Sequence, residues 1–332
     1  MNIKVNRKTA GTELATSIAP AHWTLVVFAS RESLDLLLQT LMAAQIAATG
    51  TATIDVLVNG NHPLAAALAD HLASPAFTQQ ALPTRVWDIA VGDKANAWNQ
   101  YIHQIWSGES IAFFIDGYVR LNPDSIKLLG KAIDDQAEVL GGTGVPNGAM
   151  DSSAAHAHVP ENGFHGNFCC IKGAALEQIR RRKILLPTGL YRVDSLMGAL
   201  LTLGLDPANN VWVGSRIYVH PAASWQTDSK RWWRMRDIRA QVKRIIRQSR
   251  GDLENLAIKD HLRIRKQQPE LMLPTAAELI IDWVHRCPSQ ANKVLRYNPL
   301  ARRALAELQR SAGKPKGNIN MVPVLMGCSK TP

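Results

Sequence analysis

Short apolar runs alternate with longer amphipathic stretches over the first 136 residues, and each apolar run ends in polar residues. The runs at 23–29 (WTLVVFA), 54–58 (IDVLV), 84–88 and 111–115 (IAFFI) have the length and composition of strands. The stretches at 34–48, 63–73, 93–106 and 123–136 have the length and spacing of helices. This alternation predicts an α/β fold in which a mainly parallel sheet carries helices on both faces.

Polar residues follow three of the predicted strands directly. Ser30, Asn59 and Asp116 stand at the ends of the runs at 23–29, 54–58 and 111–115. Ligands of open α/β sheets bind at the carboxyl ends of the strands. We therefore expect these three side chains to lie at one binding site.

The pattern changes after residue 140. Residues 141–148 are rich in glycine and residues 151–163 are polar, which predicts a flexible active-site loop. A strand at 168–171 and helices at 174–182 and 195–203 follow. The predicted organisation is given by four ranges: a polar lead-in at 1–20, an α/β domain at 21–225, a basic helical extension at 226–312 and a flexible tail at 313–332.

The composition excludes several classes of protein. Apolar residues make up 46% of the 332 residues and charged residues 20%, which is ordinary for a globular protein. The four cysteines form neither a disulfide framework nor a metal-binding pattern, so a reducing compartment is expected. The chain has no G-x-G-x-x-G and no G-x-x-x-x-G-K motif, which argues against dehydrogenases and kinases.

The positive charge is concentrated in one segment. The net charge is +11, and residues 230–250 contain nine Lys and Arg residues but one acid, Asp237. Such a local excess argues against a uniformly basic nucleic-acid surface and favours one local anionic partner.

The same segment predicts an amphipathic helix. Apolar residues recur at helical spacing from Trp232 to Ile246, with basic residues on the other faces. Helices of this type bind anionic membrane surfaces, and the alternative is that the apolar face packs on the α/β domain. The uncharged stretch at 36–54 is interrupted by polar residues and is interpreted as a buried helix followed by a strand. We expect a cytoplasmic protein with no secretory signal, which could bind peripherally to the inner membrane face.

Five segments, in the correct order, resemble glycosyltransferases of the GT-A fold, most closely family 2. The longest is Gly92–Leu129, in which the family pattern is matched by Lys94, Ala97, Asn99, Gly108, Asp116, Pro123 and Asp124. The others are VVFASRES, VLVNGN, HGNFCCIKGAALEQI from His165 and GLYRVDSLMGALLTLG from Gly189. Together they cover roughly residues 23–235 and imply that the α/β domain is the catalytic one.

The resemblance implies that a sugar is transferred from a nucleotide-diphosphate sugar to an acceptor hydroxyl with inversion at the anomeric carbon. We expect the nucleotide to be UDP. The acceptor class is left open among a glycan, a lipid-linked molecule and a small molecule. The implied residues are Asp194 as the general base; Ser30, Arg31, Glu32, Asn59, Lys94, Asn99 and Asp116 at the donor; Gly166, Arg231 and Trp232 at the acceptor; and Asp116 with His220 as ligands of Mg²⁺ or Mn²⁺.

Two departures from the family pattern leave alternatives open. Tyr118 replaces the second acid of the Asp-x-Asp metal motif, and Val193 replaces the first residue of the usual Glu-Asp pair. A GT-A-like binding or scaffold protein with weakened catalysis, anchored by its basic helix, is therefore the alternative. For single residues the competing interpretations are a turn or cap at Asp116, a helix N-cap at Asp194 and a structural histidine at His220.

Overall fold

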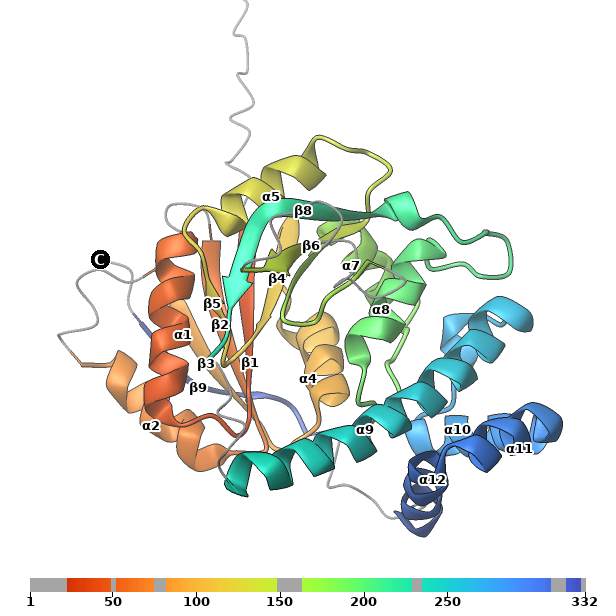
Figure 1. Ribbon diagram of the computed structural model, residues 1–332. Coiled ribbons are helices and arrows are strands. Elements are labelled where there is room, and N and C mark those ends of the chain that lie inside the picture. Colours follow the sequence, from red (N-terminus) through yellow and green to blue (C-terminus); the bar gives the residue numbers. More distant parts are fainter. Residues whose placement is uncertain are drawn as a thin grey trace, which may run out of the picture.

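The computed structural model describes residues 23–48, 52–74, 82–147, 163–228, 235–311 and 321–329, and these residues form a nine-stranded sheet flanked by helices (Figure 1). In sheet order the strands are β5 (Arg120–Leu121), β8 (Ile217–Gln226), β6 (Gly141–Pro146), β7 (Phe168–Lys172), β4 (Ile111–Asp116), β1 (Trp23–Ala29), β2 (Ala52–Asn59), β3 (Thr84–Ile89) and β9 (Val324–Cys328). The four central strands β4, β1, β2 and β3 are parallel, which confirms the predicted α/β architecture.

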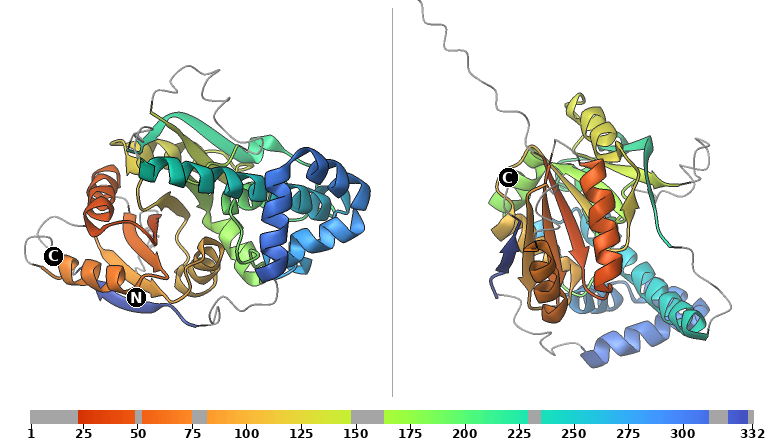
Figure 2. Two further views of the ribbon diagram at one scale, coloured as in Figure 1. Left: turned by 60° about the horizontal axis from the view of Figure 1, so that its bottom comes forward. Right: turned by 90° about the vertical axis from the view of Figure 1, so that its left-hand side faces the viewer.

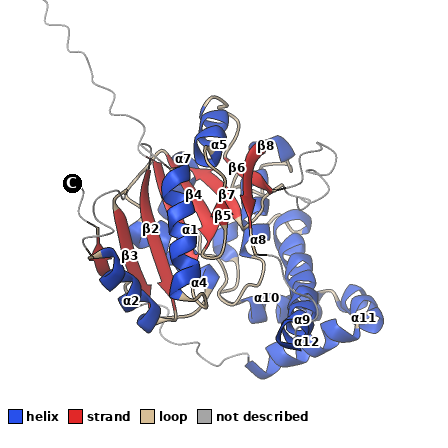
Figure 3. Ribbon diagram, turned by 60° about the vertical axis from the view of Figure 1, so that its left-hand side comes forward, coloured by secondary structure: helices blue, strands red, loops and turns tan. Residues whose placement is uncertain are grey.

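Helices cover both faces of the sheet (Figure 3). One face packs against α1 (Leu34–Ala47), α2 (His62–Leu72) and α5 (Ser125–Asp134). The other packs against α4 (Lys94–Gln100), its π-helical continuation η1 (Tyr101–Ile105), α7 (Gly173–Arg181) and α8 (Val193–Thr202). All seven side chains of β1 are buried, as expected of a central parallel strand that is covered on both faces.

Polar caps start the helices that follow the parallel strands. The side chains of Ser33, Asn61 and Asp93 accept hydrogen bonds from backbone N–H groups in the first turns of α1, α2 and α4. Each cap satisfies a donor that the helix itself leaves without a partner. The chain therefore turns from strand to helix at a fixed residue, and the polar loops are held at the carboxyl end of the sheet.

The C-terminal extension is helical, as predicted. It consists of α9 (Met235–Lys259) with its π-helical continuation η3 (Asp260–Ile264), the 3₁₀ turn η4 (Pro269–Leu271), α10 (Ala276–Arg286), α11 (Pro288–Tyr297) and α12 (Pro299–Ser311). Helix α9 runs below the sheet in Figure 1, and the two views of Figure 2 show the other helices gathered at one end of it. Leu253 and Ala257 of α9 are buried in the same apolar cluster as residues of β1 and α4, so the extension packs on the α/β domain.

The prediction of a flexible loop at 141–148 is wrong for its first part, because Gly141–Pro146 forms β6 between β7 and β8. Glycine is required there by packing. A Cβ atom on Gly144 would lie 2.5 Å from the carbonyl oxygen of Ala223 and 2.5 Å from the ring of Phe168. The glycines that suggested mobility instead allow close contact with the neighbouring strands. His156, His158 and the rest of the predicted loop up to residue 162 lie outside the described residues.

The predicted flexible tail also contains a strand. Val324–Cys328 forms β9, which pairs antiparallel with β3 and covers that edge of the sheet. Strand β8, preceded by the 3₁₀ turn η2 (Gly214–Arg216), was not predicted as a strand either. The predicted lead-in at 1–20 lies outside the described residues, and the domain boundaries remain predictions.

The uncharged stretch at 36–54 is divided between α1 and β2, as the sequence indicated. Within the ranges that the structure describes, no helix has both the length and the apolar character needed to cross a bilayer.

Candidate active site

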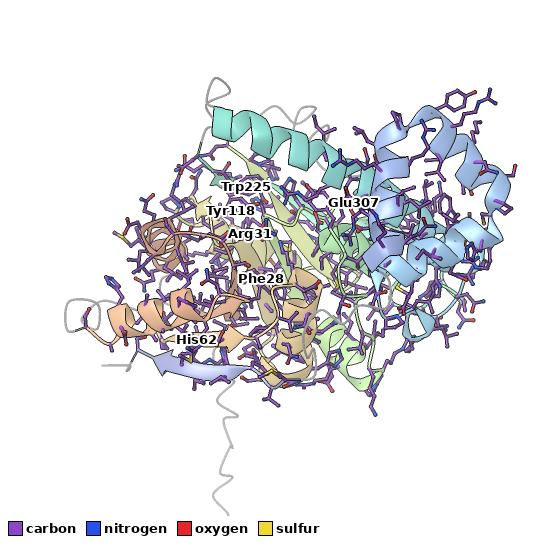
Figure 4. The ribbon with its side chains drawn as sticks, turned by 90° about the horizontal axis from the view of Figure 1, so that it is seen from below. Phe28, Arg31, His62, Tyr118, Trp225 and Glu307 are labelled. Atoms are coloured by element: carbon purple, nitrogen blue, oxygen red, sulfur yellow. The ribbon has the colours of Figure 1, made fainter. Side chains whose placement is uncertain are left out.

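A cavity of about 1280 Å³ lies between the carboxyl ends of β1, β2 and β4 and helix α9. The structure brings together at this cavity eight of the predicted site residues: Ser30, Arg31, Glu32, Asn59, Lys94, Asp116, Gly166 and Asp194. The parallel strands explain this arrangement, because their ends meet at one edge of the sheet. Figure 4 shows Arg31 and Tyr118 near each other below α9, at the centre of the molecule.

The loop after β1 is braced by its own side chains. Glu32 Oε2 accepts hydrogen bonds from the backbone N–H groups of Ser30, at 2.6 Å, and Arg31, at 2.9 Å. The Ser30 hydroxyl donates to the carbonyl oxygen of Asn59 at 2.8 Å, and the Asn59 amide donates to that of Ala29 at 2.8 Å. Ser30 and Asn59 therefore hold the ends of β1 and β2 together, Glu32 braces the loop itself, and Arg31 is left exposed at the cavity.

Asp116, the last residue of β4, has a partner at each carboxylate oxygen. Its Oδ1 atom forms an ion pair with the Lys94 ammonium at the start of α4. Its Oδ2 atom accepts a hydrogen bond of 2.9 Å from the Tyr118 hydroxyl, which also lies 3.3 Å from the amide oxygen of Asn167. Tyr118, which replaces an acid of the family motif, thus forms a hydrogen bond to Asp116, which matches that motif.

The charges at this cluster are well defined near neutral pH. Burial lowers the pKa of Lys94, but the neighbouring carboxylate of Asp116 outweighs burial and holds that pKa above its ordinary value. Burial, reinforced by the negative charge of Asp116, raises the pKa of Tyr118 far above its ordinary value. Lys94 therefore stays a cation, and the Tyr118 hydroxyl stays a hydrogen-bond donor.

Asp194 also lines the cavity, from the first turn of α8, and its charge acts on Lys94 and Tyr118. Its Oδ2 atom accepts a hydrogen bond of 3.2 Å from the backbone N–H of Gly166. A Cβ atom on Gly166 would lie 3.0 Å from the Asp194 carboxyl carbon, so a side chain there would push the Asp194 side chain out of this position. The interpretation of Asp194 as an N-cap is wrong, because the N-cap of α8 is Arg192 and Asp194 is the second helical residue.

Helix α9 holds the segment that leads into α8. Glu254 has no exposed side-chain surface and accepts hydrogen bonds from the backbone N–H groups of Tyr191 and Arg192. Arg250, one turn earlier on α9, pairs with Glu254 at 3.0 Å and donates to the carbonyl oxygen of Gly189. These contacts could not be predicted from the sequence, since the partners are about 60 residues apart and match no motif.

Two further residues of the cavity were missed. Asp93 caps α4 with one carboxylate oxygen and accepts a hydrogen bond of 2.6 Å from the backbone N–H of Gly189 with the other. His165 lies with its ring centroid 5.0 Å from that of Trp225, and burial lowers the pKa of His165 below its ordinary value. Asp93 could have been recognised from the sequence as a helix cap, because Asp is favoured at the residue before a helix. His165 lies in one of the segments that resemble the family, but the resemblance assigns no role to this histidine.

Two predicted site residues do not lie at the cavity. Asn99 exchanges two hydrogen bonds of 2.9 Å with the backbone of Leu186, so it fixes the segment before α8 and is not among the residues that line the cavity. His220 on β8 accepts hydrogen bonds at Nδ1 from the backbone N–H groups of Ala222 and Ala223 and is not among the residues that line the cavity. The Nδ1 atom thus fixes the local turn of β8, and a role of His220 at a metal ion stays a prediction. The acceptor residues predicted at 231 and 232 lie outside the described residues.

The described residues do not fit a dedicated divalent-metal site. Mg²⁺ and Mn²⁺ prefer oxygen ligands, but both oxygens of Asp116 already have partners. The described part of the chain contains no group of three or more His, Cys, Asp or Glu side chains that could hold a metal ion. An ion bound at Asp116 would also lie beside the positive charge of Lys94.

Comparison with known proteins gave no match to any family model and none to a curated protein sequence. Among solved structures, a mannosyltransferase from Pyrobaculum calidifontis, in complex with GDP-Man and Mn²⁺, is similar over 87% of this chain and 86% of its own, with 15% identity and a TM-score of 0.49. An active-site mutant of LgtC covers 50% of this chain and 67% of its own, with 11% identity and a TM-score of 0.32. The galactosyltransferase LgtC with donor and acceptor sugar analogs covers 48% and 62%, with 14% identity and a TM-score of 0.32. These similar structures are glycosyltransferases, the class that the sequence motifs resemble, and family 2 itself stays a prediction.

Proposed function

We propose that this chain is an inverting glycosyltransferase that moves a sugar from a UDP-sugar to an acceptor hydroxyl. The observation that carries the proposal is the meeting of Lys94, Asp116 and Asp194 in one cavity at the carboxyl ends of the parallel strands. A cation suits a departing diphosphate, and a carboxylate in the same cavity suits the removal of a proton from an alcohol.

The donor would lie along the ends of β1, β2 and β4. The Oδ1 atom of Asn59 and its second amide hydrogen can pair with the polar edge of a uracil, because one amide hydrogen is used by Ala29. Arg31 and Lys94 would face the diphosphate, and Ser30 and Glu32 would keep the loop in position.

The reaction would proceed by direct displacement. The acceptor hydroxyl gives its proton to Asp194 as its oxygen forms a bond to the anomeric carbon. The bond between that carbon and the diphosphate oxygen breaks, and the nucleoside diphosphate leaves with the electron pair. The Gly166 N–H bond holds one oxygen of Asp194, and the other oxygen accepts no hydrogen bond from the described residues, so it is available to the acceptor.

The acceptor would enter between α8 and α9. The cavity is lined there by Trp212, which follows α8 in the chain, by Lys259 at the end of α9 and by Arg263 of η3. The Arg263 guanidinium lies 4.5 Å from the centroid of the Trp212 ring. Aromatic and cationic groups of this kind suit a sugar or an acidic acceptor, and the acceptor could be a glycan, a lipid-linked molecule or a small molecule. Peripheral binding of the segment 232–250 to anionic lipid stays a proposal, which co-sedimentation with anionic and neutral vesicles at low and high salt would test.

Titration calorimetry with UDP and GDP, followed by release of nucleoside diphosphate from a panel of UDP- and GDP-sugars, tests the proposal. We expect UDP to bind and at least one UDP-sugar to turn over in the presence of an acceptor. Binding without turnover would favour the second candidate, a binding or scaffold protein, which the replacement of the second motif acid by Tyr118 suggests. A failure of every nucleotide to bind would refute the proposed transferase and any role as a nucleotide-binding protein.

A further inference from the structure

The inference concerns the positive charge that stabilises the leaving diphosphate, and it rests on the proposed function. A transferase of this type needs a positive charge where the leaving group develops its negative charge. A divalent ion at Asp116 was the expectation from sequence. The described residues offer no dedicated metal site but place the Lys94 ammonium against Asp116. We infer that the Lys94 ammonium, held by Asp116, takes the place of a divalent ion and contacts the diphosphate directly.

Lys94 is held in a fixed position. Its Nζ atom lies 5.7 Å from the centroid of the Phe28 ring, and that ring stacks on Trp98 and Phe114. Asp116 is in turn fixed from the other side by the Tyr118 hydroxyl. The cation therefore has an apolar support and an anchored partner, as preorganised electrostatic stabilisation requires.

Lys94 also has hydrogen-bonding capacity left for a ligand. An ammonium group carries three donors, and the structure shows one of them used, at Asp116. The neighbouring acid, Asp93, does not compete for it, because both of its oxygens accept from backbone N–H groups. The side chain is 32% exposed, on the cavity. A phosphate oxygen can therefore bind without breaking the pair with Asp116.

A second cation completes the charge. Arg31 lines the same cavity, is exposed, and its guanidinium forms no ion pair with the described residues. Lys94 and Arg31 together carry the charge of one divalent ion. A metal ion would have to displace Lys94 from Asp116 or bind beside a like charge, which is unfavourable in a partly buried cavity.

The test measures UDP binding by titration calorimetry on the full chain, first freed of metal and kept in EDTA, then supplied with Mn²⁺ or Mg²⁺. We expect the Kd of UDP to differ by less than about threefold between the two conditions, well below the tenfold change that about 1.4 kcal/mol represents. When Mn²⁺ alone is titrated into the protein and monitored by electron paramagnetic resonance, we expect no bound ion.

The variant Lys94→Met keeps the apolar stem and removes the charge. We expect it to weaken UDP binding in EDTA roughly 10- to 100-fold, the range for loss of a hydrogen bond to a charged group. The matched control is Lys127→Met, an exposed lysine on α5, which should leave the Kd unchanged. Lys94→Arg, which keeps a cation, should retain more affinity than Lys94→Met.

The outcomes separate the two proposals. UDP binding that needs Mn²⁺ or Mg²⁺ and is at least tenfold weaker in EDTA would overturn this inference and leave the proposed function standing. Unchanged UDP affinity in a folded Lys94→Met variant would also overturn this inference and leave the proposed function standing. If Lys94→Met does not fold, the comparison of wild-type binding with and without metal still decides. If neither UDP nor GDP binds under any condition, the proposed function fails, and this inference fails with it.

Discussion

The carboxylate of Glu254 on α9 accepts hydrogen bonds from the backbone N–H of Tyr191 at 3.0 and 2.9 Å, three residues before the proposed base. The C-terminal extension therefore fixes the segment that positions Asp194. Burial raises the pKa of Glu254, and the charge of Arg250 opposes that shift. The extension thus contributes a structural part of the site as well as a wall of the cavity.

The variant Glu254→Ala should destabilise the protein and reduce transfer. It leaves partly buried donors of Tyr191, Arg192 and Arg250 without their acceptor. Removing one partner of a buried ion pair costs about 3 kcal/mol. Urea unfolding and transfer rates measure both effects. Glu307→Ala is the control, because Glu307 lies exposed on α12 in a surface pair with Arg303 that contributes at most about 1 kcal/mol (Figure 4). Equal stability of the two variants would refute the role of Glu254.

The variant Asp194→Asn should bind UDP as wild type does and lose at least about 10²-fold in transfer rate, the usual scale for loss of a general base. The amide oxygen can still accept from Gly166, so the fold should be preserved. Asp35→Asn is the matched control, because Asp35 is the second residue of α1, as Asp194 is of α8, and lies exposed. Near-normal turnover of Asp194→Asn would leave Asp194 with a structural role alone.

The variant Gly144→Ala should destabilise the protein by about 1–3 kcal/mol, the usual cost of overpacking a core. The added methyl group would lie 2.5 Å from both the Ala223 carbonyl oxygen and the Phe168 ring. Gly214→Ala is the control, since a Cβ atom there meets no described atom within 4 Å, and it should change stability by no more than about 0.5 kcal/mol. Equal unfolding midpoints for the two variants would contradict the close packing of β6.

Stability should fall as the pH drops below about 6.5. Burial lowers the pKa values of four histidines from the ordinary value of 6.5: His103, His165, His220 and His261. The unfolded chain therefore binds protons at a pH where the folded chain does not, so their contribution is present above pH 6.5 and is lost as the pH falls through the folded pKa values.

Urea unfolding at pH 7.5 and 5.5 measures this loss. His103→Gln should reduce the difference between the two pH values, because His103 lies beside the Ile184 carbonyl and near the charge of Arg180. His71→Gln, at an exposed position, is the control. Equal stability of the wild type at both pH values would contradict the prediction.

The local sequence pattern determined the α/β layers and the place of the site. The runs that became β1, β2, β3 and β4 were found within two residues of their ends, because a buried parallel strand is a continuous apolar run that ends in polar residues. Since parallel strands end at one edge, Ser30, Asn59 and Asp116 could be placed together from sequence.

Only the tertiary structure decided what the site residues contact. The glycines of β6 suggested a loop. The sequence pattern does not reveal that atoms of the neighbouring strands occupy the space in which a side chain would lie. The ion pair of Lys94 with Asp116 and the bonds of Glu254 to the segment before α8 join residues that are 22 and about 60 positions apart. Sequence supplies residue types and local spacing, whereas the packing of α4 and α9 on the sheet sets the distances. Electrostatic stabilisation depends on those distances, so the fold decided which cation lies beside Asp116.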